Sequence, residues 1–200
     1  MKLTTEDFES MEKLTRVQLA TSLPGAKPMC LVGTQSTDGI TNLAPFSSIV
    51  HLGSNPMLIG MVTRPATVER HTLNNILATK HWTINHVNKE ILSQAHQCSA
   101  RYQVSEFDAS GLTAHHEPDI IAPFVAESRI RFALQLKEII DIESNNTRLI
   151  VGQVILIEFA DTLRESDGGI DLVQADTLAS TALDTYFTIT PHSKLPYAKP

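Results

Sequence analysis

The stretch of sequence that decides the fold is RIRFALQL, residues 129–136. Its apolar side chains occupy every second position, which is typical of a β-strand with one buried face: Ile130, Phe132, Leu134 and Leu136. A turn at Asn145-Asn146 follows, and then a longer apolar run, LIVGQVILIEF, at residues 149–159. Two long strands joined by a turn predict an antiparallel pair in the core of the protein.

Outward from this pair, the pattern remains mostly β. Shorter strands are predicted at residues 29–34, 49–52, 57–62 and 82–87. Turns are predicted at Asp38-Gly39, Ser54-Asn55-Pro56 and Asp167-Gly168-Gly169, and helices at 67–78, at 89–102 and around Phe107. Strands outnumber helices and hairpin signals join neighbouring strands, so a mainly β antiparallel barrel with peripheral helices is favoured over a parallel sheet. No GxGxxG motif and no P-loop occur.

Length and composition indicate one cytoplasmic domain. The 200 residues suit a single domain, with an N-terminal helix at about 4–23 and a C-terminal tail at about 186–200. The net charge of −6 argues against nucleic-acid binding, which needs clustered Lys and Arg. Two isolated cysteines and an N-terminus without an apolar signal region predict a reduced, cytoplasmic protein. The uncharged stretch from Ile40 to Thr63 is too polar for a membrane helix, and a buried segment that lines a ligand site is the better interpretation.

The first candidate binding segment is TNLAPFSS, residues 41–48. Its small residues let a flat ligand approach the backbone, Ser47 and Ser48 offer hydroxyl groups, and its main-chain N–H groups are potential donors to the polar edge of a flavin ring. The alternative is an ordinary strand exit in which Pro45 and the serines form a turn. The segment alone favours this second interpretation.

The second candidate segment surrounds the start of the predicted helix at 67–78. Arg64, Arg70, His71 and Thr72 gather there, and free N–H groups and the helix dipole favour a phosphate at such a position. Arginine adds charged hydrogen bonds and Thr72 adds a hydroxyl. The alternative is a solvated helix face with Arg70 paired to a nearby acid, and these residues alone do not decide between the two.

Other reactive side chains give no clear site. The eight histidines lack a metal-ligand spacing, although His81 and His86 lie five apart and His115-His116 are adjacent, so no metal is expected. Cys30 lies in an apolar strand and Cys98 on a helix, and both are expected in the core.

Six weak motifs in order resemble the flavin-reductase-like family, whose members include flavoredoxins. The resemblance spans about residues 27–200 and rests on these segments: Asn42-Leu43-Ala44-Pro45-Phe46-Ser47, His71-Thr72 with Asn75-Ile76, Ile84-Asn85, Ser105-Glu106-Phe107 with Gly111-Leu112-Thr113, residues 123–128 (PFVAES) and residues 149–154 (LIVGQV). The last six residues, LPYAKP, resemble the tail of one bacterial branch. Residues 183–186 lie near the family's Gly-Gly-x-x-Tyr/Phe segment, but the glycines are absent, which leaves a contact by Tyr186 in doubt.

The resemblance implies a six-stranded split barrel that forms a homodimer with FMN at the interface. It assigns the ring and ribityl chain to Asn42, Leu43, Ala44, Pro45, Phe46, Ser47 and Ser48, and the phosphate to Arg64, Arg70, His71 and Thr72. Thr63 and Asn85 complete the implied cofactor-binding set.

The implied activity is hydride transfer from NAD(P)H, as co-substrate, to the N5 atom of FMN. Such transfer depends on geometry more than on an acid or base, so no catalytic residue is expected. Reduced flavin would then serve an acceptor, such as a partner oxygenase or an electron-transfer protein. The alternatives are an FMN-binding electron carrier or redox sensor that a protein partner reduces, and a barrel that has lost flavin and binds another small ligand.

Overall fold

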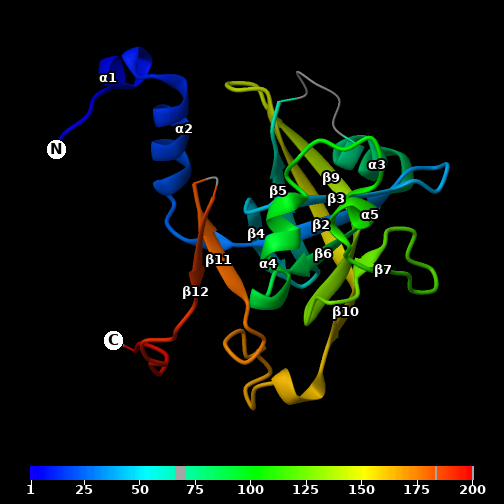
Figure 1. Cartoon of the computed structure of the whole chain (residues 1–200). Helices are drawn as coiled ribbons and strands as arrows, with labels where there is room; N and C mark the ends of the chain where they lie inside the picture. Colours follow the sequence, from blue (N-terminus) through cyan, green and yellow to red (C-terminus); the bar gives the residue numbers. More distant parts are fainter. Residues whose placement is uncertain (66–70, 183, 200) are drawn as a thin grey trace.

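A computed structural model describes residues 1–65, 71–182 and 184–199 (Figure 1). The predicted phosphate contact of Arg70 and the predicted helix start at residue 67 lie outside these residues. None of the helices in the described part of the chain is both long enough and apolar enough to span a membrane.

The main sheet contains seven strands in the order β3-β2-β6-β9-β10-β5-β4. Every neighbouring pair is antiparallel, as the hairpin signals predicted, and the sheet has one strand more than the six expected. The strands are β2 (Cys30–Gln35), β3 (Thr41–Phe46), β4 (Ile49–Ser54), β5 (Met57–Thr63), β6 (His81–His86), β9 (Ile130–Ile142) and β10 (Thr147–Phe159).

Two smaller sheets flank the main sheet. One has the order β1-β11-β12 and consists of β1 (Lys27–Pro28), β11 (Leu178–Thr181) and β12 (Thr185–Thr188). The other pairs β7 (Ala114–His115) with β8 (Phe124–Val125). The sequence pattern did not predict these short strands.

The predicted central hairpin is confirmed and is longer than expected. Strands β9 and β10 pair from Thr147↔Ile142 to Phe159↔Ile130, with register shifts next to Val151 and Val154. Asn146 in the turn adopts a left-handed φ of +57°, which Asn tolerates better than most residues. Gly39 likewise takes a φ of +84° in the predicted turn between β2 and β3.

The N-terminal segment forms two short helices instead of the single helix expected at 4–23. These are α1 (Thr5–Ser10) and α2 (Lys13–Ser22). Met11 is extended (φ −69°, ψ 141°), and the Glu12 carboxylate accepts the N–H of Thr15 at 3.0 Å, so a new helix begins there. Neither helix contains a buried residue, and both lie beside the barrel in Figure 1.

Apart from a 3₁₀ turn at Asp161–Leu163, which was not predicted, the remaining helices lie close to their predicted places. They are α3 (His71–Thr79), the 3₁₀ turn η1 (Lys89–Ile91), α4 (Leu92–Gln97), α5 (Glu106–Ser110) and the 3₁₀ turn η2 (Asp161–Leu163). The helix predicted at 89–102 is therefore shorter and begins as a 3₁₀ turn. One side of this segment packs on the core, since Ile91, Ala95 and Cys98 are buried and Leu92 is partly buried.

Strand β2 separates two apolar clusters, because alternate side chains point to opposite faces. Leu31 packs with Leu43, Val87 and other residues on one side, while Val32 belongs to the cluster around Trp82 on the other. Because Leu31 and Val32 are both fully buried, β2 is a central element of the core, and β3 beside it is an edge strand.

Candidate functional site

Strand β3, which carries most of the first candidate segment, is an edge strand whose outward-facing polar groups are largely covered. Pro45 suits an edge strand because it has no N–H to leave unpaired. The N–H of Leu43 donates to the Glu106 carboxylate of α5 at 3.0 Å, and the hydroxyls of Thr41 and Ser105 lie 2.8 Å apart. Neither Leu43 nor Pro45 therefore offers a free main-chain donor to a ligand.

The free donors of the segment lie just after β3. Neither the Ser47 hydroxyl nor the N–H groups of Ser47 and Ser48 have a hydrogen-bond partner in the described part of the chain. The Ser48 hydroxyl is already used, because it donates to the Val62 carbonyl at 2.7 Å. Ala44 and Phe46 pair with β2 at the alternate positions of the ladder, where N–H groups point to the neighbouring strand. Ser47 is thus the predicted residue best placed to donate outward.

A second group of predicted residues meets at the opposite end of β3. The Asn42 amide donates to Thr72 Oγ1 at 3.1 Å and to Thr34 Oγ1 at 3.3 Å. The Asn75 amide also donates to Thr34 Oγ1, at 3.1 Å. All four side chains are buried, so the structure joins Asn42 and Thr72 in one polar cluster between β2, β3 and α3.

Sequence reasoning missed the roles of Thr34 and Asn75 in this cluster. Asn75 carried a usable signal, because it lies three residues after Thr72 on the same helix and so shares its face. Thr34 carried none: it occupies an ordinary strand position, and only the folded sheet places it opposite Asn42.

The other predicted phosphate and ring residues lie at the end of β5 and the start of α3. Thr63 is buried and its hydroxyl donates to the Arg148 carbonyl at 3.5 Å, while Arg64 is exposed directly after it. His71 is exposed as the first residue of α3. The pairing of β5 with β10 also brings Arg148 opposite Thr63, a neighbour that the sequence did not reveal.

Asn85 is separate from both groups, and all of its side-chain polar atoms are used inside the protein. Its amide donates to the Leu31 carbonyl at 3.1 Å and to Thr83 Oγ1 at 3.0 Å, and its oxygen accepts the N–H of Val125 at 2.9 Å. Asn85 is fully buried, so it braces β2, β6 and β8.

Tyr186, the residue left in doubt, lies in β12. Its hydroxyl is 2.6 Å from Nδ1 of His96, so this side chain connects the small C-terminal sheet to α4.

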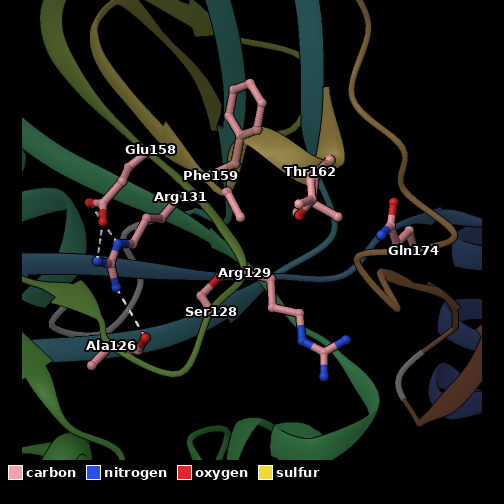
Figure 2. A pocket seen from close by; sticks show the side chains of 10 residues that line it. Ala126, Ser128, Arg129, Arg131, Glu158, Phe159, Thr162 and Gln174 are labelled. Atoms are coloured by element: carbon pink, nitrogen blue, oxygen red, sulfur yellow. Dashed lines mark hydrogen bonds and ion pairs between the residues drawn. The ribbon is translucent and has the colours of Figure 1, made fainter. Parts of the chain in front are cut away.

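A groove of about 530 Å³ lies elsewhere, near the ends of β9 and β10 (Figure 2). It contains none of the predicted site residues. Arg131 is held there by Glu158 and by the carbonyls of Val125 and Ala126, and Arg129 pairs with Asp176 and Glu90. Because both arginines are paired with acids, the groove offers no unbalanced positive charge to a phosphate.

Beside this groove, the fold gathers three potential metal ligands that sequence spacing did not reveal. The ligand atoms of His115, Glu117 and Glu158 all lie within 4.8 Å of one another. However, Arg131 donates to both carboxylate oxygens of Glu158, and these hydrogen bonds lower the pKa of Glu158. The Arg131 guanidinium therefore already occupies the Glu158 carboxylate and would compete with a metal cation for it.

The two groups at the ends of β3 define the candidate site. Asn42 and Ser47 are five residues apart along an extended strand, which corresponds to roughly 16 Å. One end presents the Thr72 hydroxyl at the start of α3, and the other presents the donors of Ser47 and Ser48. This arrangement suits an elongated ligand with an anionic group at one end and hydrogen-bond acceptors at the other.

Comparison with known proteins identifies the family of this chain. The model of the family "Flavin reductase like domain" matches residues 25–176. A proposed flavin reductase with a split barrel domain from Shewanella frigidimarina NCIMB 400 is 44% identical, with a TM-score of 0.94, over 99% of this chain and 100% of that one.

Two further relatives are more distant. Nitrilotriacetate monooxygenase component B from Bacillus cereus shares the fold, with a TM-score of 0.86 and 21% identity over 98% of both chains. An uncharacterised protein of Halalkalibacterium halodurans is 29% identical over 86% of this chain and 84% of its own length. The split-barrel fold expected from the sequence is thus confirmed, and the chain belongs to the flavin reductase-like domain family.

Proposed function

We propose that this protein binds FMN along β3 and uses it to accept hydride from NAD(P)H. The observation that carries the proposal is the pair of donor groups at the two ends of β3, whose separation is comparable to the length of an extended FMN molecule. Thr72 would donate to the phosphate, with Arg64 and His71 nearby, and Ser47 would donate to the polar edge of the ring. Family membership supports the cofactor assignment.

When bound, FMN supplies the N5 atom that accepts the hydride. The residues of the chain bind and orient the ring. Hydrogen bonds from Ser47 and from the N–H of Ser48 would hold its polar edge and tune its potential. No general base is assigned, because hydride transfer depends on alignment of donor and acceptor.

The direct test is an anaerobic mixture of FMN-loaded protein with NADH and, separately, with NADPH, followed through the blue absorption band of the flavin. Rapid bleaching with either nucleotide is expected and would identify the donor. Bound flavin that stays yellow with both would overturn the reductase and favour an electron carrier or sensor reduced by a protein. Failure to bind FMN at micromolar protein would overturn the cofactor assignment itself.

We expect Ser47→Ala to weaken FMN binding about two- to tenfold, the effect of losing one neutral hydrogen bond of ~0.5–1.5 kcal/mol. Fluorescence titration of FMN measures the change. Ser48→Ala is the matched control, because its hydroxyl donates internally to Val62 and its loss should act on stability more than on affinity. Equal affinity of wild type and Ser47→Ala would remove Ser47 from the site.

We further propose that the FMN site is completed in a homodimer. Large apolar side chains on β4, β9 and β10 have 42–44% of their surface accessible: Val50, Leu52, Ile140, Ile155 and Ile157. Such a concentration is typical of an interaction surface. In a dimer with two-fold symmetry, these side chains would pack against the same residues of the second copy.

Light scattering should therefore give about twice the chain mass of 22.0 kDa. The double variant Leu52→Glu/Ile157→Glu is expected to be monomeric and to bind FMN more weakly, since a shared site is lost. Val173→Glu, at a residue that is 45% exposed on another segment, is the control and should remain dimeric. A monomeric wild type that binds FMN would contradict the shared site.

A further inference from the structure

In the buried cluster at the start of α3, the direction of each hydrogen bond gives Asn42, Thr34 and Thr72 different roles. The resemblance placed Asn42 among the residues that hold the flavin ring and ribityl chain. In the structure, both protons of the Asn42 amide are directed to hydroxyl oxygens of the protein, Thr34 Oγ1 and Thr72 Oγ1. Because both amide protons are used within the protein, the amide nitrogen has no further proton to offer a ligand. The side chain is buried, with 8% of its surface exposed.

Thr34 fixes the orientation of that amide. A hydroxyl oxygen accepts two hydrogen bonds, and Thr34 Oγ1 receives one from Asn42 and one from Asn75. Thr34 is fully buried in β2, and Asn75 is anchored in α3, so the acceptor is held from two elements. The amide nitrogen of Asn42 is thereby kept on the side that faces Thr72.

This orientation of Asn42 determines where the Thr72 hydroxyl can donate. Its oxygen accepts from Asn42, and its own proton has no acceptor in the described part of the chain. With one lone pair occupied, the O–H bond is directed away from Asn42. A buried donor without an acceptor costs free energy, and a ligand oxygen at the start of α3 would satisfy it.

We infer that Asn42 is a positioning residue, which aims the Thr72 hydroxyl at the phosphate of FMN and donates no hydrogen bond of its own to the flavin. The inference rests on the proposed function, because it specifies how the phosphate end of the same site is built. Thr34 and Asn75 fix the orientation of the Asn42 amide. The cluster therefore governs the preference for a phosphorylated flavin over a flavin without phosphate.

Comparison of FMN with riboflavin, which lacks the phosphate, tests this role. Thr72→Val is expected to weaken FMN roughly tenfold or more, as for a hydrogen bond to a charged group, and to leave riboflavin within about twofold. Asn42→Ala should lower FMN affinity in the same selective way. The double variant should bind FMN no more weakly than Thr72→Val, because both changes remove one contact.

The riboflavin titration also shows whether each variant is folded. If Asn42→Ala does not fold, Thr34→Val acts on the same cluster without altering Asn42 or Thr72, and it should reduce the preference for FMN over riboflavin. Asn74→Ala, at an exposed position of α3, is the matched control and should change neither affinity.

Two results would overturn the inference while leaving the proposed function intact. Equal weakening of FMN and riboflavin by Asn42→Ala would mean that Asn42 contacts the ring or ribityl chain. Additive losses in the double variant would mean that Asn42 and Thr72 act separately. Wild-type protein that binds neither flavin would instead overturn the proposed function, and the phosphate role of the cluster with it.

Discussion

Gly33→Ala is expected to destabilise the protein by roughly 2–5 kcal/mol, through overpacking together with the loss of a buried hydrogen bond. A Cβ atom at Gly33 would lie 2.2 Å from the Pro123 carbonyl oxygen and 2.5 Å from Thr83 Oγ1. These two atoms already form a hydrogen bond of 2.6 Å across β2. The added methyl group would have to separate them or displace the backbone at Pro123.

Urea unfolding measures this change as a lower midpoint with an unchanged slope. Gly53→Ala is the matched control, since Gly53 is also a strand glycine and its nearest atom, the Pro56 carbonyl oxygen, would be 3.7 Å from the new Cβ. The control should unfold close to the wild type. Equal midpoints for Gly33→Ala and wild type would show that the loop at Pro123 does not pack against β2 as described.

The second large effect concerns pH. Burial lowers the pKa of His86 from 6.5 to about 4. The unfolded state therefore binds the proton more readily, and the neutral ring contributes stability that is fully present above pH 6.5 and is lost as pH falls towards 4. A difference of this size corresponds to at most about 3 kcal/mol.

The packing around His86 explains why a charge is disfavoured there. Its ring meets Phe132 edge-on with centroids 6.3 Å apart, and its Nδ1 lies 3.5 Å from the neutral hydroxyl of Thr177. Neither group compensates a positive charge.

Unfolding free energies measured from pH 7 to pH 4 should fall less steeply for His86→Gln than for wild type. His192→Gln, in the exposed C-terminal tail, is the control and should keep the wild-type slope. Parallel slopes for His86→Gln and wild type would show that His86 is hydrated in solution.

The candidate site could be predicted only in part. Residues 41–48 and 71–72 were found because their types and order are distinctive, and the structure brings Asn42 and Thr72 into direct contact. The distribution of roles within the segment was not accessible, because it depends on which N–H groups already have partners. Glu106, which occupies the N–H of Leu43, is 63 residues away along the chain.

The sequence by itself determined the local elements of this protein. The alternation at residues 129–136 specified β9, and the turn residues specified the bend between β2 and β3, because side-chain periodicity and the φ angles open to Gly39 are properties of the chain within a few residues.

Only the tertiary structure decided how these elements meet. It placed β2 between β3 and β6, set Thr34 opposite Asn42, required a glycine at residue 33 and separated Asn85 from the candidate site. The physical reason is that a buried donor takes whichever acceptor packing brings within about 3 Å. That distance is fixed by strand order and register between segments far apart in sequence, on which local periodicity carries no information.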